Sequence, residues 1–159
     1  MNRIQGDNRD MDTSRWRLRV TSTESDATRV SLRRHRFTVG KPVDFDTESG
    51  HVSALEYVLG ALAAEIVGGL RVFAKRRRIE LDHVEAVVDG HLADAMTYLE
   101  VVGESGRPRL SSVSIKVYVA SPHDEATVRR LWADTLERLP LVRTLERALD
   151  LQIELALTG

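Results

Sequence analysis

The sequence predicts an α+β domain in which antiparallel strands surround one long buried helix. Short segments with alternating apolar and polar residues occupy residues 16–39, and such alternation is typical of strands with one buried face. A long apolar stretch follows at residues 54–74, and clean alternation returns at residues 113–119 and 151–157. Because strands and helices fall into separate blocks, rather than alternating one by one, the predicted class is α+β.

The N-terminal third predicts three short strands joined as an antiparallel meander. In the first, Trp16, Leu18 and Val20 alternate with Arg17 and Arg19. A polar turn separates this segment from a second and a third alternating segment. Short turns between successive strands favour antiparallel pairing.

A long helix is predicted to begin after Ser53, because Ser53 and Glu56 have the spacing of a capping box. It is predicted to end in the basic run at residues 75–78, where positive charge favours the negative end of the helix dipole. The paired glycines Gly68 and Gly69 each cost about 1 kcal/mol relative to alanine. We therefore expect another part of the structure to approach the helix closely there.

This apolar stretch approaches the length of a bilayer span, roughly 20 residues. Glu65 lies near its middle, and a carboxylate at that depth is costly in lipid. The sequence therefore predicts a buried helix in a soluble protein and no membrane partner.

The C-terminal half predicts two strands, one or two helices and a last strand. Residues 79–92 are partly β-branched and predict the strand that precedes the alternation at 113–119. Ser121 is suited to be the N-cap of the next helix, with Pro122 as its first residue. After the interruption at Pro140, a further helical segment is predicted at residues 141–149. The expected buried face of the first of these helices comprises Val128, Leu131, Trp132, Thr135, Leu136 and Leu139.

Composition excludes several kinds of function. Lys and Arg number 23 against 24 Asp and Glu, for a formal net charge of −1, so no general attraction to nucleic acid is expected. The basic clusters at residues 33–36 and 75–78 are interpreted as a solvated hairpin and a helix end. The chain contains no cysteine, which excludes disulfides and thiol nucleophiles.

No metal site or cofactor is predicted. His83 and His91 would lie roughly 26 Å apart on one straight strand, at about 3.3 Å per residue. They could not share an ion in that geometry, and no phosphate-binding or dinucleotide-binding motif is present. Residues 1–14 are polar and lack the apolar core of a signal peptide. We expect a disordered arm at 1–14, a single domain at 15–159 and a cytoplasmic location.

Four phrases in order resemble the OsmC/Ohr family of osmotically inducible and organic hydroperoxide resistance proteins. They are RHRFTVGKP at 34–42, SALEYVLGALAAE at 53–65, VYVASPHDEATVRRLW at 117–132 and ERLPLVRTLERAL at 137–149. The resemblance covers the chain from about Trp16 onward. It implies an OsmC-like fold, an intertwined homodimer, and the stress-response, peroxiredoxin-like setting of that family.

The family's peroxide chemistry uses two cysteines, and neither is present here. By the resemblance, the first thiol position matches Glu65 and the second matches Leu139. The glutamate that opens the helix in the hydroperoxide-resistance branch falls on Leu55, with Glu56 one residue later. A carboxylate cannot cycle through sulfenate and disulfide. The resemblance therefore implies the fold and the dimer, while cysteine-based hydroperoxide reductase activity is not expected.

Glu65 is the most informative candidate residue. It could be a general base or a ligand-anchoring carboxylate in an apolar pocket. The alternative is a structural ion pair with Arg71, Arg143 or a strand arginine of the partner subunit, and we favour the ion pair. The sequence assigns no residue a catalytic role. The pocket candidates are Glu65, Glu56, Leu139, Arg143, Arg17 and Arg19, the last two only because of their place on the first strand.

The leading functional hypothesis is a stress-response-type dimer without thiol chemistry that binds a small apolar ligand at the subunit interface. Two alternatives remain open. One is an enzyme that uses Glu65 as an acid or base on a bound substrate. The other is a purely structural or interaction dimer whose pocket has filled in.

Overall fold

The computed structural model describes residues 14–158. The chain divides into two compact units, the first reaching to Ala54 and the second starting at Leu55, and each is described by itself. The predicted disordered arm lies outside the described residues, except for Ser14.

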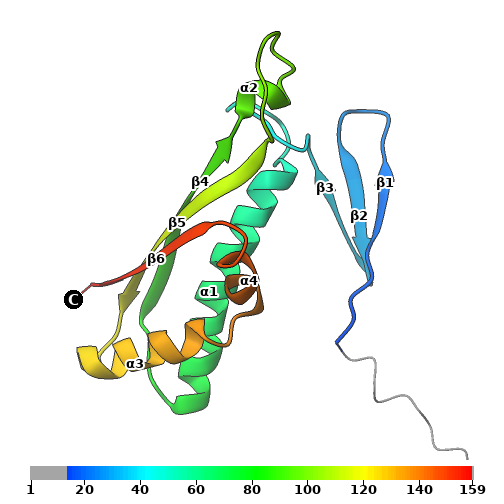
Figure 1. Cartoon of the computed structure of the whole chain (residues 1–159). Coiled ribbons are helices and arrows are strands. Elements are labelled where there is room, and N and C mark those ends of the chain that lie inside the picture. Colours follow the sequence, from blue (N-terminus) through cyan, green and yellow to red (C-terminus); the bar gives the residue numbers. More distant parts are fainter. Residues whose placement is uncertain (1–13, 159) are drawn as a thin grey trace, which may run out of the picture. The chain divides into compact units, whose positions relative to one another are not determined.

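The first unit contains a three-stranded antiparallel sheet in the order β1-β2-β3 (Figure 1). The register places Val20, Val30 and Phe37 side by side on adjacent strands, so they form one apolar row on one face. The predicted meander is confirmed. However, no residue of β1 is buried, and Val20 is 59% exposed. The strands are β1 (Arg19–Ser22), β2 (Thr28–Leu32) and β3 (His35–Val39).

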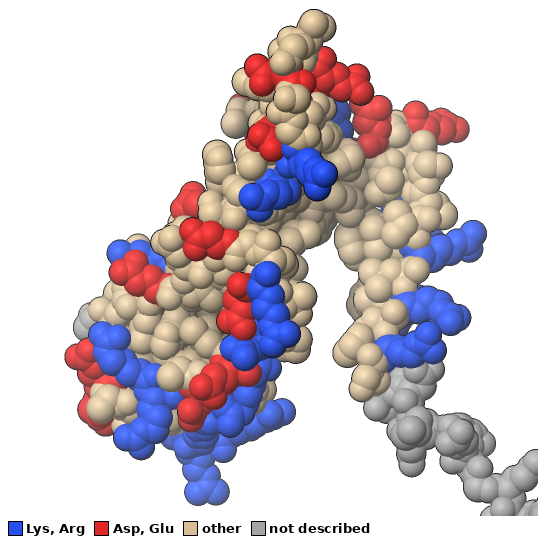
Figure 2. Space-filling view, viewed as in Figure 1, with Lys and Arg blue, Asp and Glu red and all other residues tan. Residues whose placement is uncertain are grey.

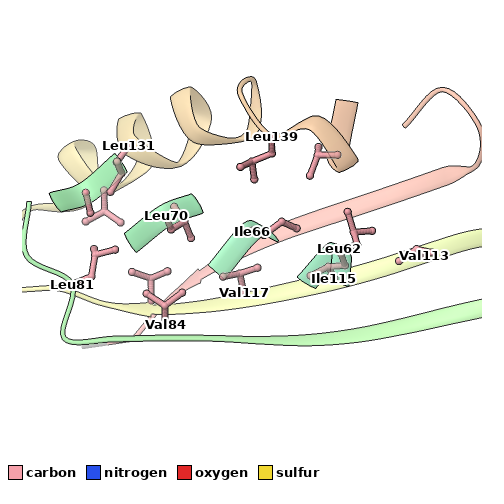
Figure 3. Packing of buried hydrophobic residues seen from close by; sticks show 14 residues of the cluster. Leu62, Ile66, Leu70, Leu81, Val84, Val113, Ile115, Val117, Leu131 and Leu139 are labelled. Atoms are coloured by element: carbon pink, nitrogen blue, oxygen red, sulfur yellow. The ribbon is translucent and has the colours of Figure 1, made fainter. Parts of the chain in front are cut away.

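In the second unit, the long helix α1 runs along one face of a three-stranded sheet (Figure 1). The sheet order is β4-β5-β6, and the α3–α4 segment lies on the same side of the sheet as α1 (Figure 3). The elements are α1 (Ala54–Arg77), β4 (His83–Ala93), α2 (Ala95–Tyr98), β5 (Arg109–Ala120), α3 (Glu125–Leu136), α4 (Pro140–Leu145) and β6 (Asp150–Leu157).

The core lies between α1, the sheet and the α3–α4 segment (Figure 3). Fully buried Leu62, Ile66 and Leu70 of α1 are spaced at i, i+4 and i+8, which places them on one side of the helix. Alternate residues of β5 face them and are equally buried. Each such side chain contributes roughly 1.5–3 kcal/mol when it leaves water, so this cluster fixes α1 on the sheet. The β5 residues are Val113, Ile115, Val117 and Val119.

The ends of α1 agree with the sequence prediction. The helix begins at Ala54, directly after the buried Ser53, and ends at Arg77. Arg78 adopts a left-handed φ of 59°, and the Ile79 amide donates to the Ala74 carbonyl at 2.9 Å. This turn closes the helix, so the following strand begins at His83 rather than at residue 79.

Two other predictions are corrected. The N-cap of α3 is Asp124, whose carboxylate accepts from the Thr127 amide at 2.9 Å. Ser121 instead donates to the Glu80 carbonyl at 2.6 Å, so its hydroxyl joins the loop to the end of α1. The helix predicted at 141–149 is the shorter α4, which ends at Leu145.

One strand pair departs from the expected antiparallel arrangement. β4 and β5 are antiparallel, but β6 pairs with β5 in parallel. The helical segment between β5 and β6 carries the chain back to the starting end of β5, which is the connection that a parallel pair requires.

Candidate functional site

The junction between α1 and the start of α4 brings together two of the residues that the sequence singled out, Glu65 and Leu139. Both carboxylate oxygens of Glu65 accept from the Leu141 amide at 3.0 Å. Glu65 Oε2 also accepts from the Val142 amide at 3.2 Å. These donors belong to the first turn of α4, where backbone amides have no partner inside the helix. Glu65 therefore caps α4 from a different helix.

The local sequence explains why α4 takes its cap from α1. Its N-cap residue is Leu139, which makes no side-chain capping hydrogen bond, and Pro140 follows at the first helical position. Proline removes one unpaired donor, yet the next two amides still need acceptors. A carboxylate also interacts favourably with the positive end of a helix, although α4 is only six residues long.

The expected ion pair of Glu65 with Arg143 of its own chain is not what the structure shows. Arg143 Nη1 lies 2.8 Å from Glu146 Oε1, so its guanidinium pairs along its own helix. Glu65 is only partly buried. Within the part of the chain that the structure describes, backbone amides donate the hydrogen bonds that its carboxylate accepts. An arginine from a partner subunit stays a prediction.

Leu139 is buried with 4% exposure against α1. A Cβ atom built on Gly69 would lie 2.6 Å from Leu139 Cδ2. Gly69 thus provides the space that Leu139 fills, which is the close approach expected from the paired glycines. A Cβ on Gly68 would meet nothing within 4 Å. Because Gly69 follows Glu65 by one turn of α1, Glu65 and Leu139 lie at the same junction.

The remaining candidates lie on other parts of the two units. Glu56 is exposed in the first turn of α1, nine residues and about 13 Å along the axis from Glu65 at 1.5 Å per residue. Arg17 and Arg19 are exposed and belong to the first unit. Arg143 lines an open cleft of about 250 Å³ beside α4. The other residues of the cleft are Leu136, Glu137, Val142, Glu146, Leu151 and Ile153.

The junction has the chemistry of a structural contact. With no cysteine in the chain, it holds no thiol to attack a peroxide. Among residues 14–158, no group of three or more His, Asp or Glu side chains is arranged to hold a metal ion. Sequence reasoning identified Glu65 and Leu139 but missed the α4 amides. The apolar N-cap followed by proline was the available signal, because such a helix start needs an acceptor from elsewhere.

The fold is similar to that of several known proteins. A family model described as OsmC-like protein matches residues 47–154. Among solved structures, an OsmC-like protein from Mycoplasma pneumoniae has a TM-score of 0.75 at 15% identity, covering 92% of this chain and 99% of its own. The organic hydroperoxide resistance protein OsmC from Legionella pneumophila has a TM-score of 0.66 at 12% identity, covering 89% and 97%. OhrB of Bacillus subtilis has a TM-score of 0.58 at 17% identity, covering 89% and 98%. No curated protein matches the chain.

These similarities define an α+β protein with the OsmC-like architecture. Since the family model matches more than half of the sequence, the chain belongs to the OsmC-like family. It is therefore a member of the OsmC/Ohr stress-response group. Unlike the members that use two thiols, this chain contains no cysteine. By length and hydropathy alone α1 could cross a membrane. Its place in this fold makes it the core helix of a soluble family instead.

Proposed function

We propose that the protein works as a homodimer without thiol chemistry, which binds a small apolar ligand where the two subunits meet. The observation that carries this proposal is the uncovered apolar face of α1. Only 28% of the residues in its most apolar 18-residue window are buried. An apolar surface of this kind on a soluble protein marks an interaction or ligand-binding surface.

The uncovered face is continuous along the helix. Tyr57, Val58 and Val72 are 37%, 45% and 48% exposed, and the residues between them on this side are small. Ala61, Ala64 and Gly68 are all exposed. Small residues let a second helix approach closely. Larger residues at the two ends of this face leave room for an apolar ligand. This combination supports a second copy of α1 as the main covering element.

The first unit adds further uncovered apolar area. Trp16, Leu18 and Val20 are 71%, 48% and 59% exposed. Val20 lies in β1 and continues the alternation of Trp16 and Leu18, which precede the strand. None of the three is buried, although such alternation normally marks a buried face. Burial of these residues against a second copy is what an intertwined homodimer would supply.

Glu65 supports a binding function better than an enzymatic one. Its two oxygens already accept three amide hydrogen bonds, so the carboxylate positions α4 rather than standing ready for a substrate. On the expected match of the family's first thiol position to Glu65, a structural contact takes the place of the thiol. The proposed setting is the cytoplasm, in keeping with a generally soluble family.

Native mass spectrometry of the purified protein tests the ligand. We expect a dimer that carries co-purified small molecules, which organic extraction removes and an apolar fluorescent probe replaces. Glu65→Gln should retain probe binding, because the charge does not touch the ligand in this account. A dimer that carries no small molecule and binds no apolar probe would instead favour the purely structural role.

A further inference from the structure

One face of the first sheet consists of arginine and hydroxyl side chains only. The strand register forms two cross-strand rows on this face, two residues apart along the strands. Arginine alternates with serine or threonine within each row and along each strand. All three arginines are exposed. The two rows, which we call the arginine face, are Arg19–Ser31–Arg36 and Thr21–Arg29–Thr38.

The opposite face of the same sheet is apolar. It carries the row formed by Val20, Val30 and Phe37, and Val30 is only 7% exposed. Successive side chains of a strand point to opposite faces, so covering the apolar row would leave the arginine face in solvent. The arginine face lies wholly within the first unit and does not depend on the proposed dimer or its ligand.

The charge of the arginine face is not neutralised within it. Arg29 is the diagonal neighbour of both Arg19 and Arg36, at about 7–8 Å between such positions. Within residues 14–158 none of the three guanidinium groups takes part in an ion pair. Like charges at this spacing repel one another, because they lie within the roughly 8 Å Debye length at physiological ionic strength. A bound anion would relieve that repulsion.

Further basic residues continue the face at one end of the strands. Arg33 and Arg34 form the turn between β2 and β3, beside the row that holds Arg19 and Arg36. The run at 33–36, expected to be a solvated hairpin end, thus joins a larger basic surface. Figure 2 shows basic side chains gathered along this part of the first unit. The acidic residues described in this unit belong to the β1–β2 turn and to the loop after β3, which leave the strands at the other end together with Lys41: Glu24, Asp26, Asp44, Asp46 and Glu48.

We propose that the arginine face binds the phosphate backbone of double-stranded nucleic acid without reading its sequence. Guanidinium groups bind phosphate oxygens through paired N–H donors, and serine and threonine hydroxyls also contact phosphates. The six residues of the face include no aromatic ring, so the bases of a single strand would find no stacking surface there. A duplex, which presents its phosphates outward, is the better fit.

The rest of the chain limits the strength of this contact. The formal net charge is −1, so we expect a local, salt-sensitive contact with a dissociation constant of about 10⁻⁴–10⁻⁶ M. An anionic membrane is a poorer partner, because surface-bound elements insert apolar side chains beside their basic ones. The apolar side chains of this sheet, Val20 and Phe37, lie on the opposite face.

Fluorescence anisotropy with a short labelled DNA duplex of arbitrary sequence tests the proposal. The wild-type protein should bind at about 50 mM salt and release the duplex toward about 200 mM. Arg19→Gln with Arg29→Gln and Arg36→Gln should weaken binding at least about tenfold and make the slope of log K against log salt shallower by about three. These side chains are exposed, so the variant should keep the wild-type circular dichroism and unfolding temperature.

Two further variants separate geometry and total charge from the arginine face. Lysine at the same three positions keeps the charge, so the salt slope should stay as in wild type while affinity falls less than with glutamine. Arg78→Gln with Arg130→Gln and Arg147→Gln removes the same charge from exposed positions of the second unit. This matched control should bind the duplex as the wild type does.

Three results would overturn the proposal. The first is a wild-type protein that does not bind the duplex at about 50 mM salt, and the second is an equal loss of binding in the matched control. The third is tighter binding of a single strand of the same length. Vesicles of phosphatidylserine and phosphatidylcholine provide the remaining comparison. Vesicle binding that the glutamine variant loses, without any duplex binding, would assign the arginine face to a membrane and also overturn the proposal.

Discussion

Glu65 holds two helices together through a contact that joins residues 76 positions apart in the chain. A side chain in the middle of α1 supplies the acceptor that the start of α4 lacks. Glu65 therefore makes a structural contact in this protein. Its partner in the same chain is the start of α4.

Removing this acceptor should destabilise the fold in a graded way. Glu65→Gln keeps one acceptor oxygen and should cost about 1–2 kcal/mol, while Glu65→Ala leaves the Leu141 and Val142 amides unpaired and should cost about 2–3 kcal/mol. Urea unfolding measures both, with the exposed Glu24→Gln as the control that changes little. Equal stability of Glu65→Ala and the wild type would contradict the capping role.

The missing thiols give a second prediction at this scale. The purified protein should not reduce cumene hydroperoxide or tert-butyl hydroperoxide with a dithiol donor, because no side chain can form a sulfenate and then a disulfide. A coupled assay for peroxide consumption measures this directly. Turnover well above a metal-free blank would show that another group carries peroxide chemistry.

Neighbouring glycines play different parts in α1. The Gly69 position is filled by Leu139 of the same chain, whereas the Gly68 position is open. Glycine costs about 1 kcal/mol in a helix relative to alanine, so Gly68 needs a reason that lies outside the single chain. Close approach of a second α1 would provide it.

Gly68→Ala separates stability from assembly. The substitution should raise intrinsic helix stability by up to about 1 kcal/mol per chain and yet weaken the dimer, since the added methyl group would lie between the two helices. Gly69→Ala is the companion variant, and it should instead disturb the packing of Leu139. Dissociation constants from dilution experiments decide the point: an unchanged or tighter Gly68→Ala dimer would contradict close packing at Gly68.

The start of α3 predicts a dependence on pH. The Thr127 hydroxyl and then the Thr127 amide, which donate to Asp124, hold the pKa of its carboxyl below the usual 3.8. A lowered pKa in the folded state means that this contribution is fully present above about pH 3.8. It is lost as the pH falls through the folded-state value.

Asp124→Asn should therefore flatten the acid end of the stability profile, because asparagine caps a helix without titrating. Thermal unfolding between about pH 5 and pH 2 measures the difference from wild type. The two proteins should differ most above pH 4 and converge in acid. Parallel profiles over the whole range would show that the Asp124 carboxylate does not contribute.

How far the sequence predicted these elements depends on the range of the interactions that form them. Alternation with a period of two residues predicted β5 and β6. The local capping pattern and the charge at the helix end predicted the ends of α1. The cap of α3 was misplaced because Ser121 and Asp124 both suit that position. The choice depends on the Glu80 carbonyl, 41 residues away from Ser121.

The candidate site was predicted in its residues but not in its contacts. Glu65 and Leu139 were identified through the family resemblance, and both lie at the α1–α4 junction. The partner of Glu65 could not be read from the sequence, because it is a pair of backbone amides that any residue could supply. The parallel pairing of β6 likewise depends on the path of α3 and α4 through space.

At the scale of the whole molecule, the proposed function depends on a second copy of the chain. The outer face of α1, Val20 and Phe37 of the first sheet, and the apolar residues of the β4–β5 loop are exposed in one subunit. Each would be a liability for solubility if it stayed uncovered. One homodimer can cover these surfaces together, and its interface offers a place for an apolar ligand.

Sedimentation equilibrium of the wild-type protein tests this central claim most directly. Over a concentration series that extends down to the low micromolar range, we predict a single species with twice the mass of the chain. Circular dichroism on the same samples confirms that the protein is folded. A folded monomer at micromolar concentration would contradict the proposed homodimer.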